Sequence, residues 1–128
     1  MRLILDTHAL LWMLQSSQRL SPRVVGLLGD PETEILVSAV SAYEICAKYT
    51  LGKLPEAAAL ASDFVGELAP LDLTPLAVTL ARAETAGKLP MIHRDPFDRL
   101  LIAQALVERV PLVSNEALFD GFGIERIW

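Results

Sequence analysis

The sequence predicts an α/β protein with a mostly parallel sheet that is covered by helices on both faces. Short apolar runs typical of buried strands alternate along the chain with longer segments that carry helical caps and helical apolar spacing. The chain has 128 residues, of which 52% are hydrophobic and 21% charged. This composition excludes a disordered protein, and the length suits a single domain over residues 1–128.

Strands are predicted where short apolar runs stop at polar or turn-forming residues. The run Arg2–Leu5 stops at Asp6, and Glu34–Val37 follows the turn at Asp30-Pro31. The five expected strands are 2–5, 34–37, 71–73, 111–113 and 124–127.

Helices are predicted from capping residues and from prolines at first helical positions. Ser21-Pro22 and Asp95-Pro96 each place a side-chain acceptor before a proline, which is typical of a helix start. The six expected helices are 9–15, 22–29, a segment starting at Ser38 or Ser41 and ending near Gly52, 55–68, a segment from Thr74-Pro75 to Gly87, and 96–109.

Charge and cysteine content narrow the function classes. Sixteen acids against eleven bases give a formal net charge of −5, which argues against a broad basic surface for nucleic acid. The single cysteine, Cys46, excludes an internal disulfide and a Cys-ligated zinc site. Asp6 and His8 interrupt the apolar N-terminus, and no other stretch is long enough to span a membrane. We therefore expect a soluble cytoplasmic protein with no membrane association.

Four acids stand out by their positions relative to the predicted elements. Asp6 follows the first strand and Glu116 follows the fourth, while Glu44 and Asp98 lie in the first turns of helices. In parallel sheets, function gathers at the carboxyl ends of the strands, so these side chains are expected to face one site. Clustered carboxylates repel one another unless they share protons or hold a cation, and oxygen ligands suit Mg²⁺ or Mn²⁺.

Each acid by itself also has a structural explanation. Asp6 suits a helix cap, Glu44 an ion pair with Lys48 four residues later, Asp98 the positive end of a helix dipole, and Glu116 a polar turn. We interpret the four together as favouring a shared ion.

Several neighbouring residues have supporting or structural interpretations. The hydroxyls of Thr7 and Ser114 suit either a hydrogen bond to a carboxylate or phosphate, or a helix cap. Asp95 fits a helix cap better than a metal ligand. His93 lies in the loop before the last helix, and a single loop histidine without a spaced partner is typical of a structural role. No GxxxxGK[ST], GxGxxG or GxSxG motif occurs, so nucleotide binding and α/β-hydrolase chemistry have no support.

Four segments carry a resemblance to a known family. They are ILDTHALLW, VSAVSAYEI, HRDPFDRLLIAQA and PLVSNEALFDGFGIERIW, and in this order they cover nearly the whole chain. They resemble the PIN domain family, and within it the VapC-like toxin ribonucleases of type II toxin–antitoxin systems. The resemblance implies a three-layer α/β/α fold with a five-stranded sheet and a ribonuclease that depends on Mg²⁺ or Mn²⁺.

The resemblance also assigns roles to the acids. Asp6, Glu44 and Asp98 match the first three acids of the family, and Asp95 matches a version of its motif. Glu116 departs from the pattern, because most members have Asp at this position, two residues after a Thr or Ser. The resemblance implies that Asp6 and Asp98 hold the ion directly and that Glu44 and Glu116 act through water or orient the nucleophile. RNA hydrolysis would leave a 5′-phosphate and a 3′-hydroxyl.

The remaining expectations concern the residues that bind RNA, the protein partners and the alternative functions. The basic residues expected nearest the site, as candidates for RNA binding, are Lys48, Lys53, Lys88, Arg94 and Arg99; Arg99 also suits pairing within its own helix. The resemblance implies a homodimer that a cognate antitoxin protein silences through an apolar groove. The alternatives are a catalytically silent PIN-like module that binds antitoxin or RNA, and a phosphoacceptor with Asp6 as nucleophile. The second has weak support, because no DxDxT follows the first strand.

Overall fold

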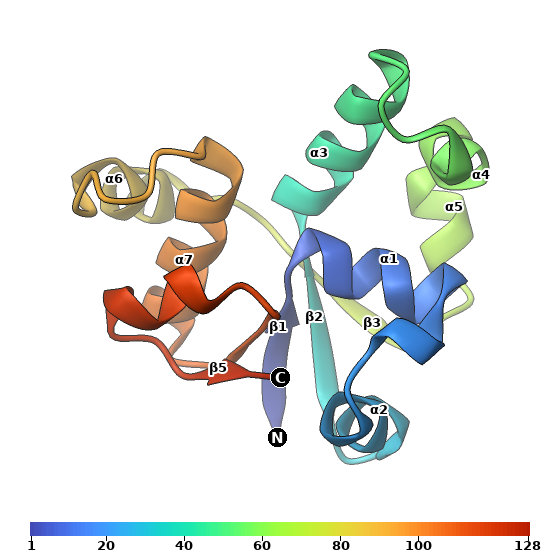
Figure 1. Ribbon diagram of the computed structural model, residues 1–128, viewed down its shortest axis with the longest axis horizontal. Helices are drawn as coiled ribbons and strands as arrows, with labels where there is room; N and C mark the ends of the chain where they lie inside the picture. The colour runs from blue at the N-terminus through green and yellow to red at the C-terminus, as the bar shows by residue number, and fades with distance from the viewer.

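Five short apolar strands form one parallel sheet in the computed structural model, which describes residues 1–128 (Figure 1). Helices and 3₁₀ turns (labelled η) connect the strands. In chain order the elements are β1 (Arg2–Leu5), α1 (Thr7–Gln15), η1 (Ser17–Arg19), α2 (Pro22–Gly29), β2 (Glu34–Ser38), α3 (Ala39–Thr50), η2 (Pro55–Ala57), α4 (Ala58–Ser62), α5 (Phe64–Leu68), β3 (Leu73–Leu76), α6 (Leu80–Lys88), α7 (Pro96–Glu108), β4 (Leu112–Val113), η3 (Ala117–Phe122) and β5 (Arg126–Ile127).

The strand order β3-β2-β1-β4-β5 places β1 in the middle of the sheet. Ile4 of β1 pairs with Leu36 of β2 on one side and with Leu112 of β4 on the other. The chain first builds the sheet outward through β2 and β3, and it later adds β4 and β5 on the opposite side of β1. The carboxyl ends of β1 and β4 therefore form a switch point, where open α/β sheets bind ligands.

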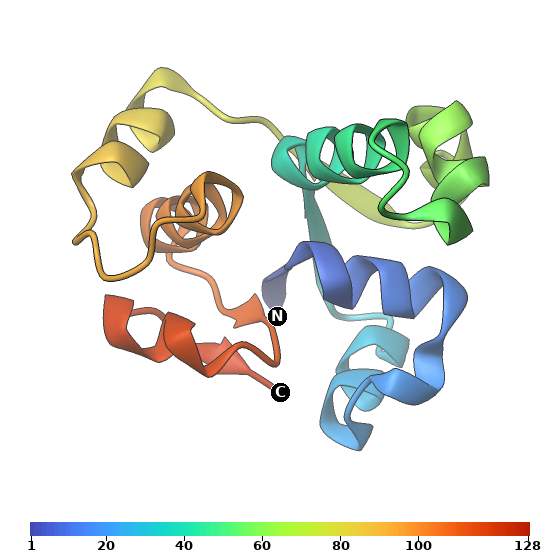
Figure 2. The same ribbon diagram turned by 45° about the horizontal axis from the view of Figure 1, so that its top comes forward.

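Helices cover both faces of the sheet, as Figures 1 and 2 show. Alternate residues of a strand point to opposite faces, so Leu3 and Leu5 pack in one core with residues of α1, α2 and α4. Ile4 packs in the second core with residues of α7 and η3. This arrangement confirms the predicted α/β class with a three-layer, five-stranded parallel sheet. None of the helices combines the length and the apolar character that a membrane span requires.

Helix α3 continues directly from β2 at the carboxyl edge of the sheet (Figure 1). Ser38 is both the last residue of β2 and the cap of α3, and its Oγ accepts the Val40 N–H at 3.0 Å. Ser41, the other predicted cap, is instead fully buried inside the helix. Because α3 begins at the end of a strand, its first turns lie at the edge where the switch point is located.

The helix predicted over 55–68 is divided into η2, α4 and α5. Asp63 ends α4 and caps α5, because its Oδ1 accepts the Gly66 N–H at 3.0 Å. A Cβ at Gly66 would overlap the Asp63 carboxylate, so a larger residue would require the Asp63 side chain to shift. The capping hydrogen bond explains why the helix stops and restarts here.

The prediction for residues 71–87 was wrong at the boundary between strand and helix. Thr74 and Pro75, taken as a helix start, belong to β3, where Pro75 is paired with Val37. Proline is tolerated there because β3 is an edge strand. Helix α6 begins at Leu80 instead, and the Thr79 hydroxyl accepts the Arg82 N–H at 3.3 Å as its cap.

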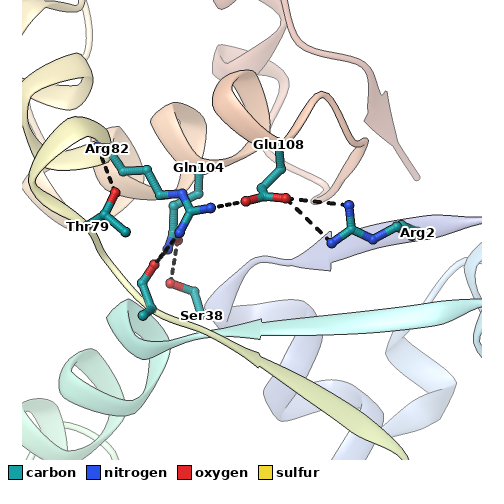
Figure 3. Close-up of polar contacts among 7 residues, drawn as sticks. Arg2, Ser38, Thr79, Arg82, Gln104 and Glu108 are labelled. Atoms are coloured by element: carbon teal, nitrogen blue, oxygen red, sulfur yellow. Dashed lines mark hydrogen bonds and ion pairs between the residues drawn. The ribbon is translucent and has the colours of Figure 1, made fainter.

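A polar network joins α6 and α7 to the sheet (Figure 3). Glu108 of α7 forms ion pairs with Arg82 of α6 and with Arg2 of β1. Gln104, which is fully buried, accepts a hydrogen bond from the Ser38 hydroxyl and donates one to the Ala77 carbonyl at 3.2 Å. The network therefore links α7, which carries Asp98, to the start of α3, which carries Glu44.

Candidate functional site

Asp6 lies between β1 and α1, at the switch point of the sheet. Its backbone N–H donates to the Val113 carbonyl at 3.0 Å, and its Oδ1 accepts the Ala9 N–H at 2.7 Å, which caps α1. The residue is only 6% exposed. Burial raises the pKa of the Asp6 carboxyl, and the Asp98 charge raises it further, while hydrogen bonds from Ser114 and Ala9 act in the opposite direction. Asp6 is thus a buried carboxyl at which negative charge is disfavoured.

Glu44 is held on α3 by hydroxyl groups from two elements. The Thr7 hydroxyl donates to Glu44 Oε1 at 2.7 Å, and it lies 3.0 Å from the Ser41 hydroxyl. All three side chains are buried. Lys48, one turn further along α3, forms an ion pair with Glu44 Oε2. Thr7 therefore supports a carboxylate, and Lys48 is engaged with the same carboxylate.

Asp98 stands in the first turn of α7 beside the helix cap. Asp95 caps α7 through hydrogen bonds from the Phe97 and Asp98 N–H groups at 2.9 and 3.2 Å. Asp98 Oδ2 lies 2.8 Å from His93 Nε2. Burial is the main cause that raises the pKa of Asp98, and the charges of Asp95 and Glu44 contribute, whereas the His93 hydrogen bond lowers it. Asp95 thus acts as the cap that we expected.

Three of the four predicted acids influence one another electrostatically. The Asp98 charge acts on Asp6, and the Glu44 charge acts on Asp98. Glu116 is exposed. The pKa of Arg126 of β5 is raised mainly by its hydrogen bond with Asp120, and the Glu116 charge adds to this effect. The buried Ser114 contacts both Asp6 and Glu116. It hydrogen-bonds Asp6, and its Oγ accepts the Glu116 backbone N–H at 3.0 Å.

Aromatic contact across the site shows that α3 and α7 lie side by side. The rings of Tyr43 and Phe97 have centroids 5.7 Å apart, and each precedes one of the acids, Glu44 or Asp98, by one residue. The two carboxylates thus come from adjacent helices.

Arg99 has a structural role instead of the RNA contact that we listed among its expected roles. It is buried, and its two terminal nitrogens donate to five backbone carbonyls at the end of α6 and in the loop before α7. These acceptors are the carbonyls of Ala86, Gly87, Leu89, Pro90 and His93. Because Arg99 is buried and both of its terminal nitrogens are engaged by backbone carbonyls, its guanidinium holds the loop together. The other candidates, Lys53, Lys88 and Arg94, are exposed.

The carboxylate oxygens of the three acids are chemically suited to a hard divalent cation. Asp6, Glu44 and Asp98 supply carboxylate oxygens, which Mg²⁺ and Mn²⁺ prefer. Burial is the main cause that raises the pKa of Asp6 and of Asp98, and the charges of neighbouring acids contribute. No three His, Cys, Asp or Glu side chains are gathered closely enough to enclose one ion. Each acid is instead held by a protein partner: Ser114, Thr7 or His93.

Two residues of the site were missed or undervalued in the sequence. Ser41 is buried against Thr7, and its only local signal is its position one turn before Glu44. His93 was interpreted as a structural loop residue, yet it contacts Asp98. The separation of five residues from Asp98 was the available signal, and it became meaningful only once the loop conformation was known.

The fold and the carboxylates define an α/β protein with an acidic site at the switch point of a parallel sheet. The model of the PIN domain family matches residues 3–123, so the chain belongs to the PIN domain family. Members of this family are generally nucleases, which are hydrolases, and they generally use divalent metals. A comparison with curated proteins finds no matching sequence.

Solved structures with a similar fold include several toxin–antitoxin complexes. VapBC2 from Rickettsia felis, bound to a promoter DNA fragment, has a TM-score of 0.74 at 17% identity, covering 99% of this chain and 98% of that one. DNA-bound VapBC from Salmonella typhimurium has a TM-score of 0.70 at 15% identity, covering 99% and 97%. FitAcB from Neisseria gonorrhoeae has a TM-score of 0.67 at 15% identity, covering 98% and 96%. At these identities the likeness establishes the shared fold.

Proposed function

We propose that this PIN domain is an Mg²⁺-dependent endoribonuclease that acts in the cytoplasm as the toxin of a toxin–antitoxin pair. The observation that carries the proposal is the placement of two buried carboxylates, Asp6 and Glu44, and a partly buried one, Asp98, beside the switch point of the sheet. Buried like charges are costly without a compensating cation, so the site favours a divalent ion. Mn²⁺ would serve as an alternative ion for the same oxygen donors.

The acids have different roles in this proposal. Asp6 and Asp98 would hold the ion directly, because they lie at the end of β1 and the start of α7 and the Asp98 charge acts on Asp6. Glu44, held by Thr7, and Glu116, joined to Ser114, act through water. When bound, a divalent ion lowers the pKa of a coordinated water and neutralises charge on the scissile phosphate. Hydrolysis breaks the bond between phosphorus and the 3′-oxygen and leaves a 5′-phosphate.

RNA contacts fall to the exposed cations near α3 and α7. Arg94, in the loop that precedes α7, is exposed and forms no ion pair. Lys48 reaches phosphate only by sharing or leaving its ion pair with Glu44. Arg94 is therefore the first phosphate contact to test.

RNA cleavage tests the proposal directly. Purified wild type, Asp6→Asn and Asp98→Asn would be incubated with a mixed RNA substrate and Mg²⁺, with EDTA as a parallel condition. We expect cleavage by the wild type only with Mg²⁺, and a loss of at least about 100-fold in either variant, because a direct metal ligand is removed. Asp72→Asn, an exposed acid outside the site, serves as the matched control and should cleave normally.

Glu116→Gln separates the fourth acid from the other three. Its exposure predicts a smaller loss of cleavage than that of the Asp6 and Asp98 variants. Cleavage that is equal in the wild type and the Asp6 or Asp98 variant would remove the metal mechanism.

A catalytically silent module that binds antitoxin or RNA is the second candidate. It is favoured by the observation that no three acidic side chains surround a common position, and by the exposure of Glu116. Calorimetric titration with Mn²⁺ distinguishes the two candidates. A nuclease should bind the ion in a manner that depends on Asp6, whereas a silent module should show no such binding.

The antitoxin partner is supported by an apolar groove of about 550 Å³ between α3, α5 and β3. Eleven of its thirteen lining residues are hydrophobic, and Val65 of α5 is 80% exposed beside it. We expect Val65→Asp to weaken co-purification with the protein that the adjacent reading frame encodes. Val25→Asp, an equivalent change on the exposed side of α2, is the control.

The homodimer stays a prediction, which sedimentation equilibrium tests.

A further inference from the structure

His93 is the only side chain that forms a hydrogen bond with the Asp98 carboxylate. It lies in the loop between α6 and α7, and its Nε2 is 2.8 Å from Asp98 Oδ2. The His93 side chain is 12% exposed, so the contact is largely shielded from water. The contact uses Oδ2 of the Asp98 carboxylate and not its other oxygen, Oδ1.

The His93 ring is held in place independently of Asp98. The rings of Phe119 and Phe122, both buried in η3, meet it edge to face with centroids 5.7 and 6.3 Å away. The His93 carbonyl accepts a hydrogen bond from Arg99 at 2.9 Å. Because both the ring and the backbone of His93 are anchored by other groups, it is His93 that restrains Asp98.

This restraint matters for a carboxylate at the start of a helix. The Asp98 side chain is 27% exposed, and without His93 it would rotate between several orientations. Groups that bind the outer side of a metal-ligating residue fix its orientation, and their loss typically lowers metal affinity. Here the ligating group is a carboxylate, and the imidazole is the group that orients it.

We propose that His93 is a positioning residue, which donates its Nε2–H to Asp98 Oδ2 and thereby presents Oδ1 to the divalent ion. The proposal rests on the proposed function, because it requires an ion at Asp98. It gives the loop between α6 and α7 a defined purpose: Arg99, Phe119 and Phe122 hold the histidine, and the histidine holds the ligand.

Two amide substitutions separate the hydrogen bond from packing. In His93→Gln the side-chain amide nitrogen occupies nearly the place of Nε2 and can still donate to Asp98. In His93→Asn the amide nitrogen lies near the place of Nδ1 and falls short of Asp98. Both substitutions introduce a polar side chain that is no larger than histidine. The two variants therefore differ mainly in how far the amide nitrogen extends toward Asp98.

The measurement is the Mn²⁺ dissociation constant of the RNA-free protein, determined by calorimetry or by electron paramagnetic resonance. We expect His93→Asn to raise the dissociation constant by about 10- to 100-fold, while His93→Gln stays close to the wild type. In RNA cleavage, His93→Asn should lose rate at limiting Mn²⁺ and recover it at saturating Mn²⁺, with KM for RNA unchanged. Asp98→Asn is included as the reference for loss of the ligand.

The outcomes separate this inference from the proposed function. If the wild type binds Mn²⁺ through Asp98 but both histidine variants bind it equally well, the positioning role is overturned and the nuclease proposal stands. Equal weakening in both variants, at unchanged thermal stability, also overturns it, because the effect would not follow the reach of the donor. If Asp98→Asn does not alter Mn²⁺ binding, the metal site itself is wrong and both proposals fail.

Discussion

Asp6 combines a structural role and a chemical role in one side chain. As the cap of α1 it accepts the Ala9 N–H at 2.7 Å, and as a buried carboxyl it has a raised pKa. The first role requires only an oxygen acceptor, which asparagine also supplies. The second requires the negative charge, so substitution by asparagine separates the two.

Asp6→Asn should make the metal-free protein more stable at neutral pH. A raised pKa means that the folded state holds the Asp6 proton more tightly than the unfolded state does. The stability from this group is present below the ordinary value of 3.8 and is lost as the pH rises through the folded pKa. At pH 7 in EDTA we expect a higher Tm for Asp6→Asn than for the wild type, with the difference shrinking as the pH is lowered.

Asp120→Asn provides a control of opposite sign. The Arg126 guanidinium beside Asp120 lowers the pKa of that carboxyl, so its contribution is present above the ordinary value and is lost at low pH. We expect this variant to be slightly less stable than the wild type at pH 7. A lower Tm for Asp6→Asn under the same conditions would contradict the assignment of Asp6 as an unfavourably buried charge.

The conformation of the loop between α6 and α7 is held by one buried arginine, Arg99. Arg99 donates to five carbonyls over residues 86–93, including those of Leu89 at 2.7 Å and Ala86 at 2.8 Å. The loop has no regular structure of its own over 89–95. Its conformation, and with it the position of His93, therefore depends on Arg99.

Arg99→Met should destabilise the protein and loosen this loop. The substitution keeps much of the apolar stem but leaves several carbonyls without their charged donor, and we expect a loss of about 3 kcal/mol in the free energy of unfolding. Urea unfolding measures the loss. Arg23→Met, on an exposed arginine of α2 without an ion pair, should change stability by less than about 0.5 kcal/mol. Equal behaviour of the two variants would show that the carbonyl contacts contribute little.

The contact between α7 and the start of α3 depends on Gln104. Its amide joins the Ser38 hydroxyl, which caps α3, to the Ala77 carbonyl after β3 (Figure 3). Gln104→Met preserves the volume but leaves the buried Ser38 hydroxyl without its acceptor, while the Ala77 carbonyl keeps only its hydrogen bond from Arg82. We expect a loss of about 1–3 kcal/mol in the free energy of unfolding. Gln15→Met is the matched control, because Gln15 makes one exposed hydrogen bond, to the Glu56 carbonyl. A comparable loss in both variants would contradict a special role for the buried amide.

At the scale of the molecule, most of the net charge of −5 comes from the four acids of the proposed site. Setting aside Asp6, Glu44, Asp98 and Glu116 leaves twelve acids against eleven bases, a balance of −1. Many of the bases are already committed. Arg2, Arg82, Arg126, Lys48 and Lys88 form ion pairs, and Arg99 is buried.

RNA binding should therefore depend only weakly on salt. With about three phosphate contacts to a single strand, the logarithm of the binding constant should fall with the logarithm of salt concentration with a slope near −2. Fluorescence anisotropy with the Asp98→Asn protein in EDTA measures this slope without cleavage. Arg94→Ala should make it shallower by about 0.7. A slope steeper than −4 would indicate a basic surface that the sequence composition argues against.

Local signals in the sequence were sufficient where a residue acts on its near neighbours. Ser21, Ser38 and Asp95 cap the helices they were predicted to cap, because a cap is a hydrogen bond over two or three residues. The signal at Thr74-Pro75 failed because pairing with β2 outweighed it, and strand pairing lies outside any local window. Helix α1 likewise begins at Thr7, two residues before the prediction, once Asp6 serves as its cap.

The sequence by itself determined the α/β class, the order of the strands along the chain and the placement of Asp6, Glu44 and Asp98 near strand and helix ends. These features follow from hydrophobic patterning and capping, which are local. Only the tertiary structure decided that Glu116 is exposed, that Arg99 is buried and that His93 contacts Asp98. Those outcomes depend on how loops pack between elements distant in sequence, where burial and hydrogen bonds from several elements act together.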